Sequence, residues 1–181
     1  MKKIGVIAFM FFAVMALNAQ EKNKIDNYKI AFYSKDATGV FKEMSGTVKS
    51  SLTTDESSKQ TEKKSLNLSF DFKIKVGSIN TGNGVQNKHA KSSEWFHAEK
   101  YPTIDFVSSS IYKTKKGVFA DGSLTLHGVT KKVSIPISIK NTEEKTIYKA
   151  EFSVNRMDYK LGPDSKVSRN IKIIAGIAVK K

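Results

Sequence analysis

The sequence predicts an all-β protein: an eight-stranded antiparallel barrel with one short helix between strands three and four. The strongest observation is at residues 66–76, where every even position is apolar and every odd position is polar. This two-residue period is that of a strand with one buried and one solvated face. Similar alternation recurs at residues 133–139, 148–154 and 171–179. Since regular strands dominate the chain, we expect a mostly β architecture.

Four further strands are predicted by weaker alternation, at residues 28–34, 41–52, 103–112 and 118–127. Short segments rich in turn-forming residues separate most of the eight strands, so neighbouring strands should pair antiparallel. The polar stretch at residues 50–64 is interpreted as a long hairpin tip. Closure into a barrel is favoured because it alone removes both exposed edges of the sheet.

The helix is predicted within residues 83–101, where alternation stops. Asn83 precedes helix-forming residues and is a suitable N-cap, because its side-chain oxygen can accept hydrogen bonds from free backbone N–H groups. Trp95 and Phe96 follow, at the helix end that would cap the mouth of the barrel. Pro102 then favours an extended conformation at the start of the fourth strand.

Residues 1–19 are predicted to be a signal peptide. Lys2 and Lys3 precede an apolar run at residues 4–17, which is too short to span a bilayer, and Ala19 before Gln20 is the expected cleavage point. Residues 20–181 then form a single domain, consistent with the usual domain size. The location predicted for the protein is therefore periplasmic or secreted.

Composition excludes several kinds of chemistry. The chain has no cysteine, which removes disulfides, thiolate metal sites and cysteine nucleophiles. The formal net charge is +14, yet Arg156 and Arg169 are the only arginines. Lysine lacks the planar fork that reads bases, so specific nucleic-acid recognition is disfavoured. Peripheral contact with an anionic membrane surface is left open, as is the choice between a monomer and a homodimer.

Catalytic motifs are missing from the sequence, so we predict no catalytic residues, no metal and no cofactor. His89 and His97 lie eight residues apart, too far along a helix to share a metal ion. His127 lies between a strand and a turn, where a hydrogen bond to the backbone is the simpler interpretation. The alternatives are a small-molecule enzyme or envelope stress factor that uses His127 with Asp121 or Asp158, and a structural interaction module of the cell envelope.

The inward-facing side chains are the candidate ligand-binding residues. An eight-stranded barrel is just wide enough to fill itself or to hold one small ligand, and Ala120, Gly122 and Ala150 should leave room inside. The predicted lining consists of Leu68, Phe70, Phe72, Ile74, Trp95, Phe96, Phe106, Leu124, Leu126, Ile135 and Phe152.

Five segments together resemble the YceI-like family of polyisoprenoid-binding periplasmic proteins. They are VGSINTGN from residue 76, HAKSSEWF from 89, EKYPTIDF from 99, GSLTLHGVTK from 122 and NRMDYKLG from 155. The resemblance implies a lipocalin-like barrel whose apolar tunnel binds a long isoprenoid chain, such as a quinone or prenyl lipid, without catalysis.

The resemblance suggests an exported binding protein for transport, storage or stress protection. Asn83, His89, His127 and Arg156 lie in or beside the matching segments and are candidates for contacts with the lipid head group or with turn backbone. Residues 86–88 are Gln, Asn and Lys, where arginine and aspartate are common in relatives. Whether this change alters head-group recognition is left open.

Overall fold

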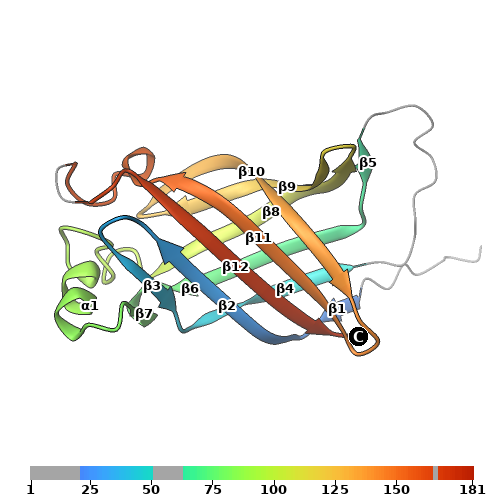
Figure 1. Ribbon diagram of the computed structural model, residues 1–181, viewed down its shortest axis with the longest axis horizontal. Coiled ribbons are helices and arrows are strands. Elements are labelled where there is room, and N and C mark those ends of the chain that lie inside the picture. The colour runs from blue at the N-terminus through green and yellow to red at the C-terminus, as the bar shows by residue number, and fades with distance from the viewer. Residues whose placement is uncertain (1–20, 51–62, 165–166) are drawn as a thin grey trace, which may run out of the picture.

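A computed structural model describes residues 21–50, 63–164 and 167–181. The predicted signal peptide and most of the predicted hairpin tip at residues 50–64 lie outside the described residues. The described chain forms one antiparallel sheet that curls around an apolar interior, with helix α1 (Gly84–Lys91) at one end of the barrel (Figure 1). The predicted all-β antiparallel fold and the helix between the third and fourth long strands are confirmed.

The eight predicted strands correspond to eight long strands. These are β2 (Ile25–Tyr33), β4 (Met44–Ser50), β6 (Leu68–Lys75), β8 (Thr103–Thr114), β9 (Gly117–Leu126), β10 (Val129–Asn141), β11 (Lys145–Asn155) and β12 (Asn170–Lys180). The sheet as described contains 12 strands, so the predicted count of eight was too low. The added strands are short: β1 (Glu21–Asn23), β3 (Thr38–Phe41), β5 (Lys64–Ser65) and β7 (Ile79–Asn80).

The higher count has two sources: β1, β5 and β7 lie outside the predicted strands, and the chain is interrupted between β3 and β4, within the predicted strand at residues 41–52. Between β3 and β4, the N–H of Lys42 donates to the backbone oxygen of Ser78, and Glu43 accepts from the N–H of Lys75. Pairing therefore changes partner there, from β2 and β7 to β6. The predicted strand at residues 66–76 is likewise shorter, because the N–H of Leu66 donates to Ile111 in β8 before β6 begins.

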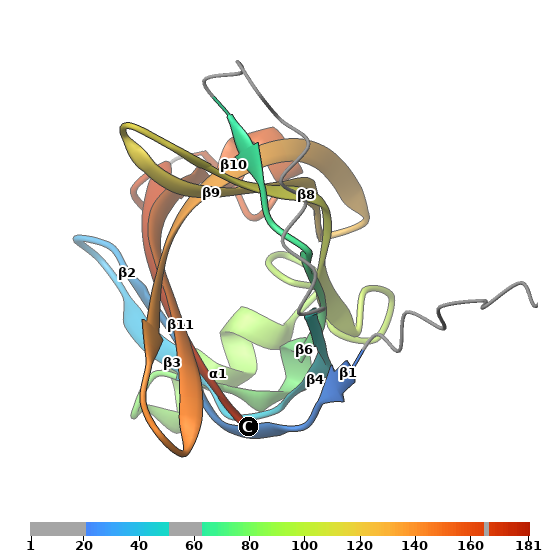
Figure 2. The same cartoon turned by 90° about the vertical axis from the view of Figure 1, so that its right-hand side faces the viewer.

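The interruption between β3 and β4 also brings the curled sheet back on itself. β3 pairs with β2 and β4 pairs with β6, so consecutive pieces of one segment join the two sides of the sheet. The Tyr28 hydroxyl strengthens this seam, donating to the backbone oxygen of Lys42 at 3.0 Å and accepting from the N–H of Met44 at 3.1 Å. Figure 2 shows the resulting ring of strands viewed along the barrel.

Alternation in β6 places its even-numbered residues inside the barrel. Phe70 and Phe72 are 5% and 7% exposed, whereas the odd-numbered Asp71 and Lys73 are exposed. Inward apolar residues from all eight long strands form or pack against one core cluster. The alternation thus identifies the buried face of the strand correctly, and that face points into the barrel.

The predicted cap of α1 is also confirmed. Oδ1 of Asn83 accepts hydrogen bonds from the N–H groups of Val85 at 2.9 Å and Gln86 at 3.1 Å. The 3-10 helices η1 (Val76–Ser78) and η2 (Arg156–Tyr159) lie in other connections at the same end of the barrel. Within the described ranges, none of the helices has the length and apolar character needed to cross a membrane.

Candidate functional site

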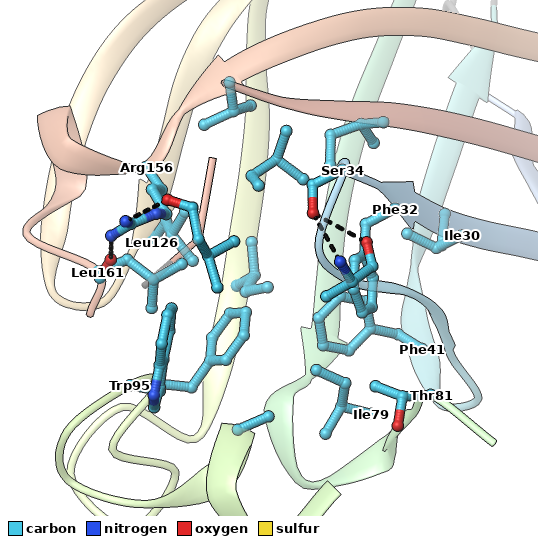
Figure 3. A pocket seen from close by; sticks show the side chains of 18 of the residues that line it. Ile30, Phe32, Ser34, Phe41, Ile79, Thr81, Trp95, Leu126, Arg156 and Leu161 are labelled. Carbon is cyan, nitrogen blue, oxygen red and sulfur yellow. Dashed lines mark hydrogen bonds between the residues drawn. The ribbon is translucent and has the colours of Figure 1, made fainter. Parts of the chain in front are cut away.

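Two adjoining cavities lie inside the barrel. The outer cavity, near α1, has a volume of about 360 Å³, and the inner cavity has a volume of about 100 Å³. Both are lined by Ile30, Ile74, Leu124, Phe152 and Ile173, so these apolar side chains lie where the two cavities adjoin. We call the two cavities together the tunnel. Figure 3 shows the outer cavity between Trp95 on one side and Phe32, Phe41 and Ile79 on the other.

Most of the predicted ligand-binding residues line this tunnel. In addition to the shared residues, Trp95, Phe96 and Leu126 line the outer cavity, and Phe70, Phe72, Phe106 and Ile135 line the inner cavity. Leu68 lines neither cavity, because it is the first residue of β6, at the barrel end away from α1. That the lining residues contact a ligand stays a prediction.

Aromatic rings form much of the inner cavity wall. Phe70 stacks on Phe72 with ring centroids 5.3 Å apart, and Tyr148 meets Phe70 edge-on at 5.2 Å. Burial raises the pKa of the Tyr148 phenol, because the ionised form would lose its hydration. The phenol therefore stays neutral over the physiological pH range and adds no charge to the wall.

Ala120, Gly122 and Ala150 were expected to leave room inside the barrel, and two of the three line a cavity. Ala120 and Ala150 line the inner cavity. A Cβ on Gly122 would lie 2.4 Å from the backbone oxygen of Val107 and 2.9 Å from the Phe106 ring. Gly122 therefore allows β8 and the Phe106 ring to approach β9 closely, and the space beside it is filled.

Trp95 connects two loops at the mouth of the outer cavity. The Arg156 guanidinium carbon lies 5.4 Å from the centroid of the indole ring. Gly162 packs so closely that a Cβ there would lie 2.4 Å from the indole. Nε2 of His89 lies 3.2 Å from the indole Nε1 and 2.7 Å from Oε2 of Glu94. These contacts hold Trp95 in place as part of the cavity wall.

Arg156 is only 1% exposed, and its guanidinium is occupied by backbone oxygens. It donates to the carbonyls of Leu161 at 2.8 Å, Gly162 at 3.3 Å, Pro163 at 2.8 Å, Val167 at 2.6 Å and Ser168 at 3.2 Å. A guanidinium has five N–H donors. Although Arg156 lines the outer cavity, its hydrogen bonds organise the loop that follows η2.

Asn83 and His127 line neither cavity, whereas His89 lines the outer cavity. His127 has a left-handed backbone with φ of 51°, and its Nδ1 donates to the backbone oxygen of Tyr159 at 3.3 Å. The Asp121 carboxylate accepts from the Tyr112 hydroxyl at 3.2 Å. Asp121 and Asp158 also lie outside the lining of both cavities. The tunnel thus does not contain the residues of the enzymatic alternative.

The lining predicted from the sequence omits several residues of the outer cavity wall. The outer cavity is also lined by Phe32, Ser34, Asp36, Ala37, Phe41, Ile79, Thr81, Gln86, Ala90, Ile104, Val154, Leu161, Val167 and Ile171. Alternation at Tyr28, Ile30 and Phe32, and again at Ile171 and Ile173, could have identified the strand members. The loop members carry no periodic signal.

Asp36 shows how a loop residue reaches the cavity wall. Its Oδ2 accepts hydrogen bonds from the N–H of Ser168 at 2.8 Å and from the Ser168 hydroxyl at 2.7 Å. These bonds stabilise the carboxylate and hold the pKa of Asp36 below its ordinary value. They tie the turn after β2 to the loop that Arg156 organises.

Nearly the whole chain matches one known domain family. The model of the YceI-like domain matches residues 18–179. The chain belongs to the YceI-like domain family. The YceI protein of Salmonella arizonae is 27% identical over 146 residues, which cover 77% of this chain and 71% of that protein. A UPF0312 protein of Photorhabdus laumondii is 35% identical over 95 residues, covering 52% of this chain and only 44% of that protein.

Solved structures of other proteins share the fold. BcnA of Burkholderia cenocepacia superposes with a TM-score of 0.71 at 23% identity, covering 83% of this chain and 95% of BcnA. A polyisoprenoid binding domain from Saccharophagus degradans, implicated in plant cell wall breakdown, has a TM-score of 0.61 at 13% identity, covering 89% of this chain and 98% of that domain. At these low identities, the likeness shows a shared fold and nothing further.

Proposed function

We propose that this protein is an exported, non-enzymatic binding protein that holds a long apolar isoprenoid lipid, a quinone or a prenyl chain, in its tunnel. The observation that carries the proposal is the pair of adjoining cavities, of about 360 and 100 Å³, with mainly aliphatic and aromatic walls. The larger volume is typical of small-molecule sites. Membership of the YceI-like family and the shared fold with a polyisoprenoid binding domain support the same ligand class.

Polar side chains at the outer cavity are largely occupied by the protein itself. The Ser34 hydroxyl donates to the backbone oxygen of Ala37 at 3.0 Å, and the Thr81 hydroxyl donates to Oδ1 of Asn87 at 2.9 Å. The guanidinium of Arg156 is saturated by carbonyls. Such a wall offers a ligand chiefly apolar contact, which favours binding by hydrophobic burial over catalysis.

The energetics of burial favour a long chain. Each buried methylene gains about 0.8 kcal/mol, whereas association costs roughly 4 to 15 kcal/mol. About ten buried methylene equivalents gain on the order of 8 kcal/mol and barely offset that cost, while about twenty gain on the order of 16 kcal/mol. A lipid that occupies both cavities should therefore remain bound through purification, and short chains should be lost.

Organic-solvent extraction of the purified, folded protein followed by mass spectrometry tests this function. We expect an isoprenoid lipid in amounts comparable to the protein. Folded protein that yields no lipid, and that binds no added isoprenoid quinone, would overturn the proposal. A recovered lipid of another class would retain the binding role and replace the ligand.

Export is a separate part of the proposal, with a separate test. If residues 1–19 are removed, the mature protein begins at Gln20 and is found in the periplasmic fraction or the medium. Intact-mass measurement and N-terminal sequencing would detect this. Protein that retains residues 1–19 would contradict export by this signal. Lipid transport, storage and stress protection are the roles we propose for an exported binder.

A further inference from the structure

We propose that the outer face of β8, β9 and β10, at the barrel end away from α1, docks on the surface of an anionic lipid bilayer. The docking patch consists of an apolar row, Tyr112, Phe119 and Pro136, together with Lys113, Lys115 and Lys116 of the adjoining β8–β9 hairpin. This inference concerns the outside of the barrel, so it does not depend on what the tunnel binds.

Strand register brings the apolar row together. Tyr112 lies opposite Phe119, and Phe119 lies opposite Pro136. Residues directly opposite one another on neighbouring strands project from the same face of a sheet. The three side chains therefore lie side by side across three strands.

Alternation places this row outside the barrel. Ile111 and Ala120, which adjoin Tyr112 and Phe119 in sequence, belong to the buried core. Because successive strand residues face opposite sides, Tyr112 and Phe119 point outward. Their rings stack with centroids 5.9 Å apart and stay partly exposed, and Pro136 is exposed. An outward aromatic pair of this kind leaves apolar surface in contact with water.

Positive charge surrounds the row. Lys113, Lys115 and Lys116 are exposed, and within the described part of the chain none of them forms an ion pair. Lys113 lies directly opposite Lys64 of β5, and Nζ of Lys63 lies 4.5 Å from the centroid of the Tyr112 ring. Asp121 also adjoins the row, where its carboxylate accepts a hydrogen bond from the Tyr112 hydroxyl at 3.2 Å, so the lysines near the row outnumber this carboxylate.

A lipid surface fits these residue types better than a nucleic acid does. The patch contains lysines, which are point charges, and lacks the arginine forks that bind phosphates or bases bidentately. Aromatic side chains with a polar tip favour the membrane–water interface, and lysine clusters are attracted to anionic lipids. The hairpin lies at the opposite end of the barrel from α1 (Figure 1), so a docked protein keeps the mouth of the outer cavity free.

Vesicle cosedimentation tests the docking patch. The purified full protein is mixed with vesicles of phosphatidylcholine alone or with added phosphatidylglycerol, at low and high salt. We expect binding to the anionic vesicles only, weakened by salt because the Debye length shortens. Each lysine near an anionic surface contributes about fivefold to the partition coefficient. The triple variant Lys113→Gln, Lys115→Gln, Lys116→Gln should therefore bind roughly 100-fold more weakly.

A matched triple variant, Lys29→Gln, Lys49→Gln, Lys91→Gln, removes the same charge from exposed positions on β2, β4 and α1. It should lose less than fivefold, and Phe119→Ser should lose several-fold while retaining wild-type circular dichroism. Equal losses in both triple variants would assign binding to net charge and overturn the patch. Failure to bind anionic vesicles, or tight binding to heparin or single-stranded DNA that the patch variant alone weakens, would overturn the lipid surface as partner.

Discussion

Replacing Leu124 by asparagine should weaken lipid binding strongly with little change in side-chain size. Leu124 is 7% exposed and lines both cavities, among the apolar side chains of Ile30, Ile74, Phe152 and Ile173. An asparagine amide at this position would face an apolar chain when the tunnel is occupied. In an empty tunnel, water could satisfy the same amide, so the penalty falls mainly on the bound state.

The magnitude follows from the cost of burying an amide without a hydrogen-bond partner. Protein substitutions place that cost at about 1 to 3 kcal/mol, which corresponds to roughly 5- to 150-fold weaker affinity. Leu124→Met keeps the apolar volume and should bind within about fivefold of the wild type. Ser123→Asn, one residue away on the outer face, should bind as the wild type does.

Titration with an isoprenoid quinone can be followed by the fluorescence of Trp95, which is the only tryptophan of the chain and lines the outer cavity. Each variant is first checked for unchanged circular dichroism. The reasoning is refuted if Leu124→Asn binds as tightly as the wild type, or if Leu124→Met and Ser123→Asn lose as much affinity as Leu124→Asn. Either result would mean that the wall where the two cavities adjoin does not contact the ligand.

Three further variants test the loops at the mouth. Arg156→Met leaves buried carbonyls without donors, at about 1 to 3 kcal/mol each. It should lower the free energy of unfolding in urea by about 3 kcal/mol or more, and wild-type stability would contradict this role. Gly162→Ala combines a left-handed φ of 69° with a clash against the Trp95 indole, so it should destabilise the protein by about 1 to 2 kcal/mol or more and shift the tryptophan emission. Unchanged emission would contradict the close packing of Gly162 on the indole. In Ser168→Ala, the pKa of Asp36 measured by NMR should rise towards its ordinary value of 3.8. A pKa that is lowered in the folded state contributes stability that is lost as the pH falls through that pKa. The variant should therefore lose less stability than the wild type on acidification. An unchanged pKa of Asp36 would refute the role given to the Ser168 hydroxyl.

The sequence by itself determined the features that depend on local chemistry. A two-residue period identifies a strand and its buried face, so the inward positions of Phe70 and Phe72 were predictable from residues 66–76 alone. The cap at Asn83 was equally predictable, because N-cap hydrogen bonds join groups only two or three residues apart. Ordered segments with family spacing indicated the YceI-like family before any contact between strands was known.

Only the tertiary structure decided where those faces leave space and what occupies it. The division between β3 and β4 depends on Ser78 and Lys75, more than thirty residues away along the chain. Gly122, expected to leave room, is filled because the Phe106 ring of the neighbouring strand packs against it. Arg156, a candidate for the head group, donates instead to the loop carbonyls that surround it. Periodicity states which way a side chain points, whereas a cavity is the volume that all the side chains together fail to fill, and that volume depends on contacts between residues far apart in the sequence.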